Sequence, residues 1–179
     1  DSDLLQEYMN KWDGNGFIGE LQLKNDEKVL EIGVGTGRLA RRVAPLCKVF
    51  VGVDISSKTI ERAEKNLAQL ENVKLHCVDF IEHAFDCSFD VIYSSLTFMH
   101  IKNKQEAINK IATLLNDNGR FVLSIDKNKN EYIDYGTRIV EIYPDDLSIT
   151  KKYIKKSGLQ LEKVIETELA YIIVATNRY

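Results

Sequence analysis

The stretch Val29-Leu30-Glu31-Ile32-Gly33-Val34-Gly35-Thr36-Gly37-Arg38 decides the fold of this chain. A short apolar run bounded by glycines is typical of a buried strand, and the segment from Leu39 onward has helical periodicity, so the glycines are expected on a strand-to-helix turn. Glycine lacks a Cβ and adopts positive φ readily, which lets the backbone approach a bound molecule, and the first amides of the helix remain unpaired. The stretch therefore predicts a site for a nucleotide-like cofactor.

The spacing of the glycines distinguishes two kinds of cofactor. A dinucleotide site requires G-x-G-x-x-G, which would place its third glycine at the position of Arg38. This chain instead has an acid, one spacer and three alternating glycines, namely Glu31, Gly33, Gly35 and Gly37. That arrangement resembles motif I of the class I S-adenosylmethionine-dependent methyltransferases. The resemblance implies S-adenosylmethionine as cofactor and S-adenosylhomocysteine as product, with NAD as the weaker alternative.

Length and composition narrow the class of protein. The 179 residues suffice for one domain with its own core, so a single domain over 1–179 is expected. A net charge of -3 does not support a dedicated nucleic-acid binder. The cysteines lack metal-ligand spacing, so no metal is expected and a cytoplasmic location is favoured. No apolar run reaches the roughly 20 residues of a membrane span, so no membrane partner is expected. The oligomeric state is left open.

Apolar runs alternate with segments of helical periodicity from residue 28 onward. This alternation predicts βαβ units and a parallel sheet covered by helices on both faces. Asn103 and Glu106 resemble a capping box at the start of one helix, and Asn118-Gly119 predicts the turn that leaves it. We expect strands at 29–32, 49–53, 73–78, 89–93 and 121–125, and helices at 3–11, 39–46, 58–70 and 104–115.

The C-terminal part predicts a helix over 145–157 and two strands, 159–165 and 169–176. Because the connection between these strands is so short, they must be antiparallel. The resemblance implies an α/β fold with a doubly wound, mostly parallel sheet of seven strands, ordered 3-2-1-4-5-7-6, and an antiparallel C-terminal hairpin. The expected parts are an N-terminal helix and lid (1–27), a cofactor-binding core (28–126), a substrate-side insertion with a short hairpin around Gly136 (127–144), and a C-terminal helix and hairpin (145–179).

Polar residues follow several of the expected strands. Ligands of open α/β sheets bind outside the carboxyl ends of the strands. Asp54 ends the second strand, where a carboxylate accepts hydrogen bonds from both hydroxyls of a ribose, and Ile55 beside it is placed to pack on adenine. An aspartate in such a place is otherwise a helix N-cap or a solvated turn residue.

The resemblance assigns the remaining cofactor contacts. It implies that Asp79 accepts a hydrogen bond from the adenine amino group, with Phe80 beside the ring. It also implies that Glu31 orients the methionine part, and that the strand end at Ser94 receives the methionine ammonium. An ionised carboxylate at Glu31 would be costly inside a buried strand without a partner, which by itself suggests a function.

The acceptor end is less defined by the sequence. His100 follows the fourth strand and is a candidate general base, because an ordinary histidine pKa suits proton removal near neutral pH. The alternative is a histidine that only packs beneath the loop. Tyr8 and Trp12, together with Phe17, are candidate lid aromatics, and Tyr135 and Arg138 are candidates for substrate contact.

The expected function is methyl transfer from S-adenosylmethionine to an unidentified small-molecule acceptor. The fourth strand resembles motif IV of the family, but neither N-P-P-Y nor a Pro-Cys pair follows it, which argues against methylation of adenine or glutamine amino groups and of cytosine C5. An RNA or protein methyltransferase and a noncatalytic S-adenosylmethionine-binding subunit remain alternatives, and an NAD-dependent oxidoreductase is the weakest.

Overall fold

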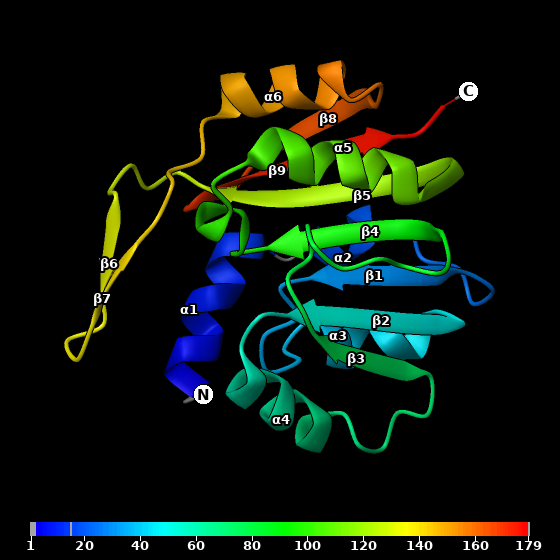
Figure 1. Ribbon diagram of the computed structural model, residues 1–179, viewed down its shortest axis with the longest axis horizontal. Coiled ribbons are helices and arrows are strands. Elements are labelled where there is room, and N and C mark those ends of the chain that lie inside the picture. Colours follow the sequence, from blue (N-terminus) through cyan, green and yellow to red (C-terminus); the bar gives the residue numbers. More distant parts are fainter. Residues whose placement is uncertain (1–2, 15, 179) are drawn as a thin grey trace.

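Seven strands form a single central sheet in the computed structural model, which describes residues 3–14 and 16–178 (Figure 1). The strand order is β3-β2-β1-β4-β5-β9-β8, which confirms the expected order because β8 and β9 are the sixth and seventh strands of this sheet. The strands are β1 (Lys28–Ile32), β2 (Val49–Asp54), β3 (Val73–Cys77), β4 (Phe89–Ser95), β5 (Leu115–Asp126), β8 (Gln160–Glu166) and β9 (Ala170–Thr176).

The sheet is parallel except at one strand. β1 pairs in parallel with β2 and β4, and β4 pairs in parallel with β5. β9 runs antiparallel to both β5 and β8, and its register with β8 shifts between Leu161 and Lys163. The parallel arrangement brings the carboxyl ends of β1, β2 and β4 to one edge of the sheet.

Helices cover both faces of the sheet, as the sequence predicts (Figure 1). Side chains of β1 alternate, because Leu30 packs in a core cluster with α5 and α6, whereas Val29 packs in a second cluster with α2, α3 and α4. This alternation follows the two-residue period of a strand. The helices are α1 (Asp3–Asp13), α2 (Phe17–Glu20), α3 (Ala40–Val43), α4 (Ser57–Asn66), α5 (Lys104–Leu114) and α6 (Leu147–Lys156), with 3-10 turns η1 (Ala44–Leu46) and η2 (Phe98–His100).

Several predicted boundaries differ from the structure. The helix expected at 39–46 is the short α3 followed by η1, because Pro45 cannot continue the hydrogen-bonding pattern of an α-helix. The turn expected at Asn118-Gly119 lies within β5 instead. There Asn118 has a φ of +62°, its amide donates to the Asn177 carbonyl, and the register with β4 shifts. Helix α1 also continues to Asp13, beyond the predicted end.

The expected hairpin around Gly136 is present and stands apart from the main sheet (Figure 1). It consists of β6 (Tyr132–Asp134) and β7 (Ile139–Glu141). The Tyr135 amide donates to the Arg138 carbonyl over 2.9 Å, and Gly136 has a φ of +76°. No helix in the described ranges has the length and apolar character needed to cross a membrane.

The N-cap of α6, Asp146, can be tested by substitution. The Asp146 carboxylate accepts the Ile149 amide over 2.9 Å, so Asp146→Ala is expected to lower the free energy of unfolding by about 1 kcal/mol. Urea unfolding measures this loss. Ser148→Ala alters an exposed residue of the same turn and should leave stability nearly unchanged. Equal losses in the two variants would contradict the capping role.

Candidate functional site

A cavity of about 820 Å³ opens at the carboxyl edge of the sheet. Its wall comes from the glycine turn after β1, the ends of β2 and β4, the segment after β3, the loop containing η2, helix α1 and the β6–β7 hairpin. Ligand pockets usually range from about 300 to 1,000 Å³, so this cavity is near the upper end of that range. The edge is the one where the fold places ligands of open α/β sheets.

The glycine turn fixes the floor of this cavity. The amides of Gly33 and Val34 both donate to the Val53 carbonyl, over 2.9 and 3.0 Å. The Gly35 amide donates to Asp54 Oδ2 over 3.1 Å, so the turn is tied to the end of β2. Gly33, Gly35 and Gly37 have φ values of +77°, +57° and +90°, a region that residues with a side chain rarely adopt.

The three glycines differ in what surrounds them. A Cβ at Gly33 would lie 1.9 Å from Thr97 Oγ1, and one at Gly37 would lie 2.9 Å from a methyl carbon of Leu67. A Cβ at Gly35 would meet nothing within 4 Å. Gly33 and Gly37 are therefore required by packing within the protein, and Gly37 does not line the cavity. Gly35 instead faces open space, as a backbone that cradles a ligand would.

Two matched variants separate these requirements. Gly35→Ala should cost about 1 to 2 kcal/mol of stability, because only the left-handed backbone is strained. Gly33→Ala should cost about 1 to 3 kcal/mol more, because its Cβ also collides with Thr97. Urea unfolding of both variants measures the difference, and adding Thr97→Ala should restore part of the loss at Gly33 only. Equal costs, with no such restoration, would contradict the assignment.

Glu31 is a buried acid in the cavity wall. Its residue is 3% exposed, and Tyr93 Oη donates to Glu31 Oε2 over 2.8 Å. Burial raises the pKa of Glu31 from 4.5 to about 8, although the Tyr93 hydrogen bond and the charge of Arg38 oppose this shift. The carboxyl group is thus mostly protonated at neutral pH. A cationic group beside it would favour the ionised form.

The raised pKa of Glu31 predicts a pH dependence of stability. Between pH 4.5 and about 8 the folded protein holds a proton that the unfolded chain has released, so stability falls as the pH rises through this window. Glu31→Gln removes this titration and should lose less stability than the wild type over the same window. Urea unfolding at several pH values tests this, with the exposed Glu71→Gln as control. Parallel curves for wild type and Glu31→Gln would refute it.

Asp54 stands at the end of β2 with its carboxylate held in place. Besides accepting from Gly35, it accepts the Ser56 amide at Oδ1 over 2.9 Å. Asp54 and Ile55 both line the cavity, and Ile55 is 73% exposed. The structure therefore places a fixed carboxylate and a free apolar side chain side by side, as the sequence predicts for a ribose and an adenine ring. Their contact with a ligand stays a prediction.

The segment after β3 supplies the next part of the wall. Asp79 Oδ1 accepts the amides of Ile81 and Glu82 over 2.7 and 3.3 Å, so its carboxylate also organises its own turn. Asp79 and Phe80 line the cavity, with Phe80 only 6% exposed. Ser94 is different, because its Oγ donates to the Ile32 carbonyl over 2.8 Å and its side chain does not line the cavity. The ligand role predicted for Ser94 stays a prediction, and Ser95 is the serine in the wall.

A buried polar junction attaches α1 to the site, and no local sequence pattern indicates it. The Arg38 guanidinium lies 2.5 Å from Asp13 Oδ2 and donates to Asn10 Oδ1 over 2.9 Å. Ser95 Oγ donates to Asp13 Oδ1, and Asp13 is 2% exposed. Arg38, which occupies the place of the third dinucleotide glycine, thereby joins the glycine turn to the end of α1.

The expected lid aromatics lie away from the cavity in this structure. Met9 lines the wall, among the side chains of α1 that the structure describes. Tyr8 is 52% exposed, and Trp12 lies next to it, with ring centroids 6.0 Å apart. Phe17 is a core residue, 1% exposed, and packs edge-on against Tyr93. The helical period alone does not say which side of α1 meets the cavity, so Met9 was missed. The lid role of residues 1–27 stays a prediction.

His100, at the end of η2, also lines the cavity. Partial desolvation lowers the pKa of His100, and the charge of Lys104 lowers it further. The imidazole is therefore neutral at neutral pH and able to accept a proton. Tyr135 of the hairpin also lines the cavity. Arg138 lies behind it, with its guanidinium carbon 5.5 Å from the Tyr135 ring centroid.

Comparison with known proteins agrees with this geometry. Residues 23–167 match a family described as a methyltransferase domain. The chain belongs to this family. It is 32% identical to an uncharacterized methyltransferase of Bacillus licheniformis over 87% of this chain and 68% of the relative. An uncharacterized methyltransferase of Schizosaccharomyces pombe is 26% identical over 70% of this chain, which spans only 46% of that relative.

Solved structures share the fold at low sequence identity. An S-adenosylmethionine-dependent methyltransferase from Clostridium acetobutylicum has a TM-score of 0.78 at 17% identity, covering 96% of this chain and 92% of that one. Magnesium protoporphyrin IX methyltransferase from Synechocystis, solved with bound S-adenosylmethionine, has a TM-score of 0.70 at 17% identity and covers 99% of this chain and 77% of that one. The architecture is thus that of the class I methyltransferases.

Proposed function

We propose that this protein transfers a methyl group from S-adenosylmethionine to a small-molecule acceptor. The observation that carries the proposal is the convergence of Glu31, the open Gly35 backbone and Asp54 on one cavity. The first is a buried acid suited to a cationic ligand, the second leaves room for a ligand against the backbone, and the third presents a fixed carboxylate. Membership of the methyltransferase family supports the same reading.

The residues present fit the cofactor by their chemistry. Asp54 would accept from the ribose hydroxyls, Glu31 would balance the positive charge of the methionine part, and Asp79 would accept from the adenine amino group. When bound, S-adenosylmethionine supplies a methyl group on a positively charged sulfur, and its transfer leaves S-adenosylhomocysteine. Ile55 and Phe80 would provide apolar contact with the adenine ring.

The chain's own contribution to the reaction is alignment, exclusion of water and acceptance of a proton. Placing two reactants in line removes much of the entropic barrier of a bimolecular step. Met9 of α1 and Tyr135 of the hairpin border the cavity, so residues 1–27 and 127–144 would cover it as lid and substrate-side insertion. His100, neutral in this wall, would take the proton that an O–H or N–H nucleophile gives up on methylation.

Relatives with named acceptors support a small molecule. The chain is 32% identical over 112 residues to 27-O-demethylrifamycin SV methyltransferase of Amycolatopsis mediterranei. It is 35% identical over 104 residues to demethylmenaquinone methyltransferase of Thermotoga maritima. The chain spans less than half of each of those proteins, 41% and 43%. The free thiols of Cys47, Cys77 and Cys87 suit a cytoplasmic location for this activity.

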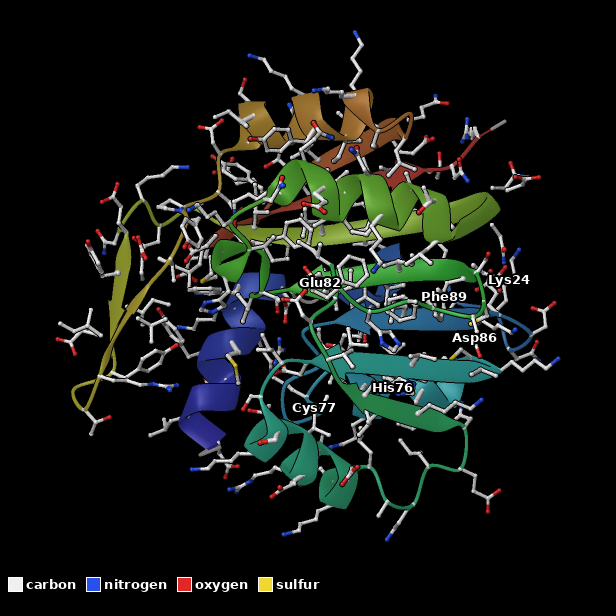
Figure 2. The ribbon with its side chains drawn as sticks, in the orientation of Figure 1. Lys24, His76, Cys77, Glu82, Asp86 and Phe89 are labelled. Carbon is white, nitrogen blue, oxygen red and sulfur yellow. The ribbon has the colours of Figure 1, made fainter. Side chains whose placement is uncertain are left out.

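Calorimetry with S-adenosylhomocysteine and NAD tests the cofactor. We expect binding of the former and no response to the latter. Asp54→Asn should weaken S-adenosylhomocysteine binding about tenfold or more, because a hydrogen bond to a charged group contributes roughly 1.5 to 3 kcal/mol. Asp86→Asn is the matched control, since Asp86 lies toward the opposite edge of the sheet (Figure 2). NAD binding alone, or unchanged affinity in a folded Asp54→Asn variant, would overturn the proposal.

Transfer of a labelled methyl group into the small-molecule fraction of a cell extract tests turnover. Label in that fraction supports the proposed acceptor class. Label in RNA or protein would replace it with a macromolecular acceptor. Cofactor binding without any transfer would indicate a noncatalytic binding subunit.

A further inference from the structure

Five residues of the cavity wall, drawn from α1, the loop containing η2, the hairpin and the segment after it, have a distinct chemical character. We define the outer wall as Met9, His100, Lys102, Tyr135 and Tyr143, all of which line the cavity. It therefore combines two phenol rings, a thioether and a neutral imidazole with one ammonium group. The Tyr143 amide donates to the Met99 carbonyl over 2.7 Å, so the base of the hairpin is joined to the loop that carries His100.

Acidic residues of the cavity belong to its other parts. Glu31 and Asp54 lie at the glycine turn, and Asp79, Glu82 and Glu106 all lie close enough to Lys110 to act on its charge. Glu106 also accepts a hydrogen bond from the Asn103 side chain over 2.7 Å. The acids of the hairpin, namely Glu131, Asp134 and Glu141, do not line the cavity. The five residues of the outer wall thus include no carboxylate. Glu106 lines the cavity four residues after Lys102, and the charge of Asp54 acts on His100.

The cations beside the two tyrosine rings are Lys102, which lines the cavity, and Arg138, which does not. Lys102 Nζ lies 6.0 Å from the Tyr143 ring centroid, and the Arg138 guanidinium carbon lies 5.5 Å from the Tyr135 ring centroid. Within residues 3–14 and 16–178, neither Lys102 nor Arg138 forms a salt bridge with a carboxylate. Arg38, which lines the cavity as Lys102 does, is already paired with Asp13. Two phenol rings are therefore each accompanied by an unpaired positive charge.

We propose that the methyl acceptor is a flat, unsaturated or aromatic molecule with a negatively charged substituent. Its ring would pack against Tyr135 and Tyr143, and its anionic group would be directed toward Lys102 and Arg138. This inference rests on the proposed function and specifies its acceptor. Aromatic pairs gain about 0.5 to 1.5 kcal/mol beyond burial alone, which gives the two tyrosines a preference for a planar ring.

A cationic acceptor is the competing possibility, since tyrosine rings also attract ammonium groups. Here that attraction is opposed, because Lys102 and Arg138 already accompany these two rings and would repel a further cation. An anion meets no carboxylate in the outer wall. The positive charges therefore favour an anionic acceptor over a cationic one. The tyrosine rings alone do not distinguish the two.

A size-matched series of probes tests this charge preference. The protein is first saturated with S-adenosylhomocysteine and then titrated with 2-naphthoate, 2-naphthamide and 2-naphthylmethylamine at neutral pH, with binding followed by NMR. We expect the anion to bind about fivefold more tightly than the neutral amide, as for a partly exposed ion pair, and the cation to bind most weakly. Tyr135→Ala should weaken all three probes.

Substitution of the two cations separates this effect from general attraction to a basic protein surface. Lys102→Gln combined with Arg138→Gln should abolish the preference for 2-naphthoate and leave binding of 2-naphthamide nearly unchanged. Lys151→Gln combined with Lys155→Gln removes two exposed charges of α6 and should change none of the affinities. Failure of S-adenosylhomocysteine to bind would instead count against the proposed function.

Three results would overturn the inference while leaving the proposed function intact. One is equal or tighter binding of the amine. Another is a preference for the anion that persists in the Lys102→Gln/Arg138→Gln variant. The third is absence of binding by all three probes, up to their solubility limits, to protein loaded with S-adenosylhomocysteine.

Discussion

Gly33 lies where the chain leaving β1 passes between Val53 of β2 and Thr97 of the loop after β4, and no side chain fits there. Its amide and that of Val34 share the Val53 carbonyl, which turns the chain so that the Gly35 amide reaches Asp54. The same close approach packs the loop after β4, with η2 and His100, against the turn. The close packing at Gly33 thus positions the glycine turn, the Asp54 carboxylate and the loop that carries His100.

Several charged residues near the glycine turn affect the ionisation of Glu31. The charges of Asp13 and Asp54 both raise the pKa of Glu31, whereas the charge of Arg38 lowers it. Since Arg38 is engaged by Asp13, Glu31 is left with a hydrogen bond from Tyr93 and retains its proton through burial. An unpaired buried carboxylate would be costly. A positively charged ligand in this cavity would favour the ionised form of Glu31 and would be attracted to it.

Much of the fold follows from local patterns in the sequence. Alternating periodicity located the strands and helices, and the Asn103–Glu106 pair marked the start of α5, where the structure has the cap and a hydrogen bond between the two side chains. Errors arose where a single residue changed the local geometry, as Pro45 does after α3.

Local sequence patterns predicted only part of the candidate site. Gly33, Asp54 and Asp79 were found because their positions relative to the strands are local features, and the structure brings them to one cavity or its immediate support. The Ser95–Asp13 hydrogen bond joins residues 82 positions apart, and no local pattern indicates such a partner. Met9 and Tyr143 were missed for a similar reason, because their roles depend on how α1 and the hairpin are placed against the sheet.

The register shift in β8 bears on whether the edge of the sheet can pair with the edge of another sheet. β8 is an outer strand of the sheet, and an open strand edge is a template for pairing with another chain. The shift between Leu161 and Lys163 interrupts regular pairing, and charged residues, Glu162, Lys163 and Glu166, follow in the same strand. At the other edge, β3 exposes Lys74 and His76. Both ends of the sheet are therefore poor surfaces for the edge-to-edge association that leads to aggregation.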